Sequence, residues 1–194
     1  MKRAVVVLLG AVAFAAFATW AAHAQQPAGD GARYNGASML RPANYREWTF
    51  LASGLGMTYD PAGGSSTAPK NFTNVFVNPS AYRAFAKDGK WPNGTVLLLE
   101  VRASASEGSI NQGGNFQTDL RGIEAHVKDS RFPGGWAFFN FSDRQGLKDS
   151  AEPLSTEQAQ RCVDCHVQHG AVDTTFVQFY PTLIDAARRA GTYK

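Results

Sequence analysis

The only two cysteines of the chain lie near its C-terminus, in the stretch RCVDCHVQHG at residues 161–170. Two residues separate Cys162 from Cys165, and His166 follows directly. Covalent attachment of a haem needs two thiols at the separation of the vinyl groups and an imidazole that reaches the iron from the same side. The spacing therefore predicts one haem c, attached through Cys162 and Cys165, with His166 as the proximal iron ligand.

Two other interpretations of the cysteine pair remain open at this stage. A disulfide between Cys162 and Cys165 would close a very small loop and add little stability. A structural zinc would need a fourth ligand, for which His169 is the sole neighbour. A thioredoxin-like pair would stand at the start of a helix after a βαβ unit, and no such unit precedes this one.

The N-terminus has the pattern of a secretory signal. Lys2 and Arg3 precede an apolar run that ends at Trp20, and Ala22-His23-Ala24 forms a small-x-small cleavage site. We expect cleavage near Ala24 and export to the periplasm, with an uncleaved N-terminal anchor as the alternative. No later stretch is long and apolar enough to span a bilayer, so we expect no membrane association after cleavage.

Charge and length restrict the class of protein further. Loss of Lys2 and Arg3 with the signal lowers the formal net charge from +3 to +1, and no run of basic residues remains, which argues against a nucleic-acid partner. About 170 residues are left, enough for one domain with a substantial core. We expect a signal peptide at 1–24, a flexible lead-in rich in Gln, Gly and Ala at 25–40, and a single domain at 41–194.

Hydrophobic periodicity predicts an α+β fold. Alternating apolar residues predict strands, and spacing of three to four predicts helices. Strands are expected at 71–79, 94–106, 119–130 and 134–143, and a loop at 59–69. Helices are expected at 41–56, at 80–89, from Ser155 onward, and after Pro181 within 176–191, where Gly191 ends the helix. The expected architecture is a mostly antiparallel sheet flanked by short helices, with a C-terminal helical segment that carries the haem-attachment motif.

The ligand opposite His166 would decide between electron transfer and ligand chemistry. The candidates are Met39, Met57, His126 and His169. His169 lies three residues beyond His166 and belongs to the same side of the helix. Packing is the default role of a methionine, and a hydrogen-bonded side chain that of a strand histidine. A six-coordinate electron carrier that uses His126 or a methionine therefore stays open as an alternative.

Five segments in order resemble the cytochrome P460 family, which includes the cytochromes c′-beta. They are NYREWTF, VFVNPSAYRAFAKDGKWPNGTVLLLEV, GIEAHVKDSRFPGGWAFFNFSD, CVDCH and FVQFYPTL, and they span nearly the whole mature chain. The resemblance implies a mostly antiparallel β fold with a C-terminal haem site in a periplasmic homodimer. It also implies a five-coordinate haem with His166 proximal.

The resemblance assigns roles to individual positions. Hydroxylamine-oxidising members carry a lysine bonded to the haem edge, and that position is Leu99 in this chain, which cannot form the bond. Glu124 matches the carboxylate that receives protons from bound substrate. Leu97, Leu99 and Val101 share one face of the expected strand, so we expect them to form an apolar wall over the iron. The other expected contributors to this wall are Phe72, Phe138 and Phe139.

These residues predict a small molecule at the iron, either as a ligand that is only bound or as a substrate that is oxidised. The protein is expected to bind nitric oxide or hydroxylamine at an open iron, as a small-molecule ligand or as a substrate. Leu99 favours the binding behaviour of the c′-beta branch, whereas Glu124 keeps an oxidoreductase activity open, since a carboxylate beside bound substrate suits proton removal. A second cytochrome is the expected redox partner.

Overall fold

The computed structural model describes residues 29–58 and 70–194. The expected signal peptide at 1–24, the first residues of the expected lead-in and the expected loop at 59–69 lie outside the described residues. No helix in the described part of the chain is both long and apolar enough to cross a membrane.

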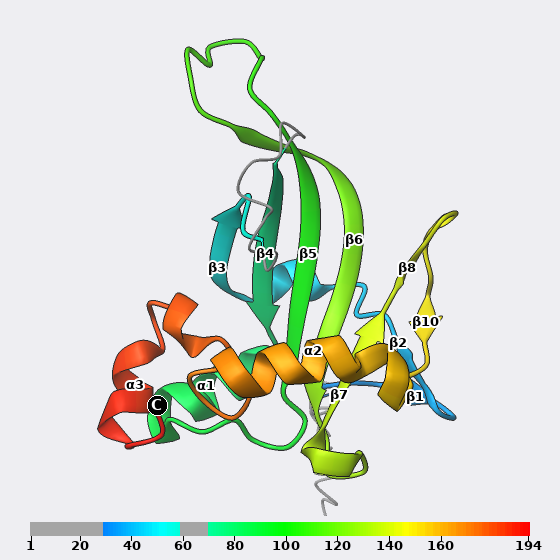
Figure 1. Cartoon of the computed structure of the whole chain (residues 1–194), viewed down its shortest axis with the longest axis vertical. Coiled ribbons are helices and arrows are strands. Elements are labelled where there is room, and N and C mark those ends of the chain that lie inside the picture. The colour runs from blue at the N-terminus through cyan, green and yellow to red at the C-terminus, as the bar shows by residue number, and fades with distance from the viewer. Residues whose placement is uncertain (1–28, 59–69) are drawn as a thin grey trace, which may run out of the picture.

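A five-stranded antiparallel sheet forms the centre of the fold (Figure 1). Its strands lie side by side in chain order, as β3 (Thr49–Leu55), β4 (Asn71–Val77), β5 (Val96–Ala105), β6 (Phe116–Lys128) and β7 (Trp136–Asn140). The α+β class with an antiparallel sheet is confirmed. The predicted strands at 71–79, 94–106, 119–130 and 134–143 correspond to β4, β5, β6 and β7.

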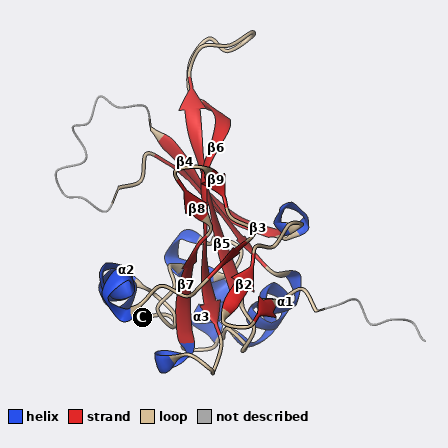
Figure 2. Ribbon diagram, turned by 90° about the vertical axis from the view of Figure 1, so that its right-hand side faces the viewer, coloured by secondary structure: helices blue, strands red, loops and turns tan. Residues whose placement is uncertain are grey.

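Within residues 29–58 and 70–194 the helices that accompany the sheet are α1 (Pro79–Asp88), α2 (Thr156–His169) and α3 (Ile184–Arg189). Helix α2 crosses one face of the sheet in front of β5 and β6, as Figures 1 and 2 show from two directions. Helices α1 and α3 contact each other at one end of that face. The described part of the chain also has single 3-10 turns at Tyr45–Glu47, Pro133–Gly135 and Val177–Phe179.

Five short strands lie outside the main sheet. They are β1 (Tyr34–Asn35), β2 (Ser38–Leu40), β8 (Ser142–Asp143), β9 (Gly146–Leu147) and β10 (Ser150–Ala151). Strands β1, β2 and β10 form a small sheet, and β8 pairs with β9. Met39 of β2 is fully buried. The segment expected as a flexible lead-in therefore contributes a hairpin and a core side chain.

The helix expected at 41–56 is wrong. The structure has a single 3-10 turn at Tyr45–Glu47, and β3 then pairs with β4 along its length. Thr49, Phe50 and Leu51 favour extended structure, and pairing with β4 satisfies the backbone groups of the segment. The helical spacing of its apolar residues was outweighed by this long-range pairing.

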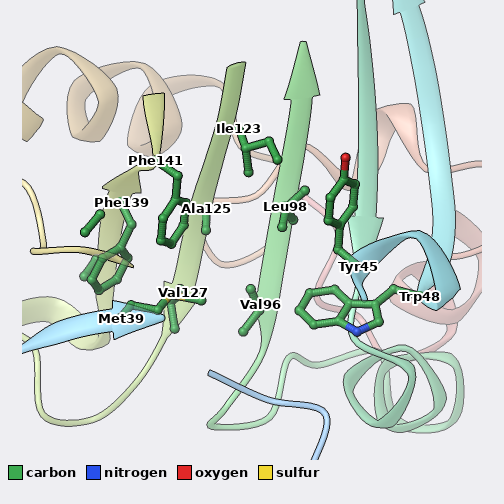
Figure 3. Packing of buried hydrophobic residues seen from close by; sticks show 12 residues of the cluster. Met39, Tyr45, Trp48, Val96, Leu98, Ile123, Ala125, Val127, Phe139 and Phe141 are labelled. Atoms are coloured by element: carbon green, nitrogen blue, oxygen red, sulfur yellow. The ribbon is translucent and has the colours of Figure 1, made fainter. Parts of the chain in front are cut away.

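Strand alternation gives the central sheet two different faces. Val96, Leu98, Ile123, Ala125 and Val127 project to the face away from α2, where they join a buried cluster with Met39, Tyr45, Trp48, Phe139 and Phe141 (Figure 3). Residues of opposite parity on the same strands, such as Leu97, Leu99, Glu124 and His126, project toward α2. The first face is a closed core, and the second carries the candidate site.

A buried carboxylate sits within the closed face. Glu100 is 1% exposed and accepts hydrogen bonds from the Tyr45 hydroxyl, from Arg46 at 2.6 Å, from Asn74 at 3.0 Å and from Arg102 at 2.8 Å. Burial raises the pKa of this carboxyl, but the hydrogen bonds and the charge of Arg46 outweigh burial and hold the pKa below its ordinary value of 4.5. Glu100 thus ties the 3-10 turn to β4 and β5.

We predict that Glu100→Ala lowers the free energy of unfolding by about 3 kcal/mol, because it leaves two arginines and a tyrosine without their shared acceptor. A carboxyl with a lowered pKa stabilises the fold above its unfolded-state pKa and loses that contribution as the pH falls through the folded-state value. In denaturant unfolding below pH 4.5, the difference in free energy of unfolding between the wild type and Glu100→Ala should therefore become smaller. The exposed neighbour Glu47→Ala serves as the control and should change stability little; an equal loss in both variants would contradict this role.

Candidate haem site

The Cys-x-x-Cys-His motif lies within helix α2. The helix begins with a capping box, in which the Ser155 hydroxyl accepts from the Gln158 backbone and the Gln158 side chain accepts from the Ser155 backbone. Residues spaced by three and four lie on one side of a helix, so Cys162, Cys165 and His166 are presented together. Both cysteines are free thiols of intermediate exposure.

A strained loop after α2 orients the His166 ring. The Nδ1 atom of His166 lies 2.7 Å from the carbonyl oxygen of Thr174, to which it donates. Asp173 and Thr174 both have positive φ angles, of 44° and 61°, and a β-branched residue rarely adopts this conformation. Such strain persists where the surrounding structure fixes it, commonly at functional sites. With Nδ1 occupied, Nε2 is the nitrogen available to a metal.

Gly170 permits the close return of this loop. A Cβ atom at this position would lie 2.5 Å from the His166 carbonyl oxygen and 2.8 Å from the Thr174 carbonyl carbon. Lys128 of β6 forms an ion pair with Asp173 and holds the loop from the other side. Neither Gly170 nor Thr174 was identified from the sequence, because their contributions are a missing side chain and a backbone carbonyl. The one available signal was a glycine soon after the candidate ligand His166.

A cavity of about 270 Å³ lies between α2 and the sheet. Cys162 and His166 line it from the helix, and Phe176 and Tyr180 line it from the C-terminal segment. The sheet side is built from two rows of paired residues that run across the strands. One row is Val75, Leu99, Glu124 and Asn140, and the other includes Leu97, His126 and Phe138.

Aromatic rings surround His166. Its centroid lies 4.4 Å from Phe176, 5.0 Å from Phe138 and 4.7 Å from His126. Burial lowers the pKa of His166, and the Thr174 hydrogen bond only partly offsets this. A neutral imidazole is the form that coordinates a metal, so the surroundings favour the ligating state.

His126 lies beside His166 rather than opposite it. Metal–imidazole bonds of about 2 Å would keep the nitrogens of two trans ligands about 4 Å apart and their ring centroids further still. The two centroids are only 4.7 Å apart, with the rings inclined at 79°. His126 also stacks on Phe138 at 4.1 Å. Burial, followed by the charge of His166, lowers the pKa of His126 well below its ordinary value.

Glu124 reaches the cavity from the centre of the sheet. The residue as a whole is solvent-exposed. Burial of its carboxyl group nevertheless raises the pKa of that group above its ordinary value. The carboxylate also lies close enough to the Cys162 thiol to raise the pKa of that thiol, after the larger effect of burial. Glu124 is therefore a carboxylate at the open side of the cavity, near the motif.

The structure brings some predicted site residues together and separates others. Leu99 pairs with Glu124, and both line the cavity with Cys162 and His166. Phe72 does not line it, because Phe72 shares strand parity with Asn74, which turns to Glu100 on the opposite face. Asn140 of β7 pairs with Glu124 of β6, and both line the cavity. Asn140 was not identified from the sequence.

The other predicted iron ligands lie away from the cavity. Met39 is buried in the opposite core, Met57 is 44% exposed, and His169 is exposed at the end of α2. No group of three or more His, Cys, Asp or Glu side chains in the described ranges is arranged to hold a metal ion by itself. This arrangement does not favour the zinc alternative.

The residues present fit a haem better than a metal ion or a disulfide. The cavity is largely apolar, the motif cysteines are free, and the orienting hydrogen bond leaves Nε2 of His166 as the coordinating atom. A search among curated proteins found no match to the chain. The family model described as Cytochrome P460 matches residues 42–177, a range that includes β3 to β7 and the whole Cys-x-x-Cys-His motif. The chain belongs to the cytochrome P460 family of haem cytochromes.

Proposed function

We propose that this chain is an exported cytochrome with one c-type haem whose iron has an open position for a small nitrogen-containing ligand, nitric oxide or hydroxylamine. The observation that carries the proposal is the wall that faces His166 and Cys162 across the cavity. That wall offers Val75, Leu97 and Leu99 with a single carboxylate, Glu124, among them.

The motif residues would hold the haem. The thiols of Cys162 and Cys165 would each form a thioether by addition to one vinyl group of the haem, with the thiol hydrogen taken up by the other vinyl carbon and no net oxidation. His166 supplies Nε2 to the iron while Thr174 holds Nδ1. When bound, the haem supplies a coordination position and a one-electron redox couple.

The distribution of polar groups supports an open position. His126 is in edge contact with His166, and Met39 and Met57 lie away from the cavity. The rival function, a six-coordinate electron carrier with His126 or a methionine as second ligand, would require these residues to move. In place of a second ligand, Leu99 and Leu97 present branched alkyl groups to the cavity. These groups limit the size of a bound ligand and exclude water from the cavity.

In this proposal Glu124 is needed to oxidise a substrate but not to bind a ligand. Its raised pKa brings the carboxylate nearer to the basicity that suits removal of a proton from a substrate such as hydroxylamine. The electrons of such an oxidation would leave to a partner cytochrome. Nitric oxide carries no proton, so its binding needs only the apolar wall. Leu99 in the lysine position of the hydroxylamine-oxidising members favours binding as the main activity.

Location and assembly complete the proposal. The signal pattern at 1–24 supports export to the periplasm, where haem attachment to cysteines takes place, and the family resemblance supports a homodimer. Nucleic acid and membrane are not expected partners of the mature chain.

Covalent attachment is tested by mass. Intact mass spectrometry after acid–acetone extraction should show a chain that begins near Gln25 and carries one haem, because thioether bonds survive this treatment. Cys162→Ala and Cys165→Ala should each leave one bond, and the double variant should lose all haem on extraction. Val163→Ala, a change between the two cysteines, is the control. Free haem from the wild type would contradict the attachment.

The Leu99 position is tested by spectroscopy. The wild type should show an ordinary high-spin ferric c-type spectrum without the red-shifted ferrous Soret band of lysine-bonded members, since leucine forms no bond to the haem edge. Leu99→Lys should bring an amine to the cavity and alter the spectrum with pH, whereas Leu98→Lys, on the opposite face, should instead destabilise the fold. A haem bond from another lysine in the wild type would refute the assignment.

Glu124 and the open position are tested together. Glu124→Ala should leave nitric oxide affinity within about twofold and reduce any hydroxylamine oxidation by at least the roughly 100-fold expected of a lost general base. Glu157→Ala, an exposed carboxylate of α2, is the control. A low-spin ferric spectrum that becomes high-spin only in His126→Ala would instead establish the electron carrier. An unchanged rate in Glu124→Ala would restrict the function to ligand binding.

A further inference from the structure

A second cavity lies on the other flank of His166. It has a volume of about 150 Å³ and is bounded by Trp136 at the start of β7, by Val163 and Val167 of α2, and by Thr174. His126, Phe138 and His166 line both cavities and form the wall between them. The second cavity is thus in contact with the proposed axial ligand on the side away from Glu124.

Three buried polar atoms without a protein partner belong to residues that line this cavity. They are Nδ1 of His126, Nε1 of Trp136 and Oγ1 of Thr174, each without a hydrogen bond to any described group. His126 is only 7% exposed. An unmade hydrogen bond of a buried polar group costs about 1–3 kcal/mol, and folded proteins rarely leave such groups unsatisfied. Three around one cavity indicate an occupant that supplies the missing bonds.

The chemistry of the three atoms restricts the occupant. The indole nitrogen only donates, the hydroxyl both donates and accepts, and an imidazole nitrogen does one or the other according to its tautomer. None of the described residues that line the cavity is Lys, Arg, Asp or Glu, so a charged molecule would find no counter-charge in this lining. A small neutral molecule that both donates and accepts is required, and each water needs only about 10–15 Å³ of such space.

We propose that this cavity is a binding site for a cluster of ordered water molecules that joins Trp136, His126 and Thr174 beside the axial histidine. Hydrogen-bonding partners and polarity around a ligating histidine tune the metal it holds. Water dipoles next to His166 favour the more positively charged ferric state, so the cluster keeps the reduction potential of the haem low. The proposal does not depend on which ligand the open iron position takes.

The water site is tested first by crystallography of the haem-loaded protein at a resolution that orders solvent. At least one water is expected within hydrogen-bonding distance of both Trp136 Nε1 and His126 Nδ1. Direct pairing of these atoms with protein or haem groups, or a cavity filled by side chains, would overturn the proposal.

The effect on the haem is tested by a matched pair of substitutions. Trp136→Phe removes one donor from the cavity and should displace water and raise the reduction potential. Trp48→Phe removes the same group from the opposite core, where the Trp48 indole nitrogen is also buried without a partner, and should leave the potential unchanged. Equal shifts in both variants, or no shift in Trp136→Phe, would refute the tuning role. His126→Phe provides a second variant with the same expected direction.

Discussion

The His166 ring donates from Nδ1 to the Thr174 carbonyl oxygen, and this contact sets the geometry of everything around it. It leaves Nε2 as the nitrogen available to a metal and holds the ring against His126, Phe138 and Phe176. Two residues in the left-handed region cost about 1–3 kcal/mol each, a cost that the core supporting the loop must offset. The absence of a side chain at Gly170 allows the approach.

Both faces of the sheet carry a buried core that can offset this strain. The face away from α2 contains the apolar cluster of Figure 3 and the fully bonded Glu100. The face toward α2 contains a second buried cluster, which includes Leu97, Phe85 and Leu183, and beside it the cavity of the candidate site. Because both faces alternate along the same strands, β5 and β6 anchor Leu99 and Glu124 in a rigid frame.

The local signals in the sequence predicted the fold well where neighbours along the chain decide it. Alternation identified β4 to β7, and the Ser155 start identified α2. The segment at 41–56 was assigned to a helix because its apolar spacing is ambiguous and only pairing with β4 decides it. The same reason hid Asn140, whose place opposite Glu124 depends on strand register. Thr174 acts through its backbone, which no residue pattern reveals.

The two halves of the site come from separate parts of the chain. Its anchor half, from Cys162 to Thr174, is a short continuous segment in which the ring and its acceptor are eight residues apart. The facing half, Val75, Leu97, Leu99 and Glu124, comes from three strands much earlier in the sequence. Under the proposed function, substitutions in the strands would therefore alter which molecule meets the iron, while the segment that would hold the haem stays intact. Such an arrangement lets ligand selectivity diversify by single replacements without loss of the prosthetic group.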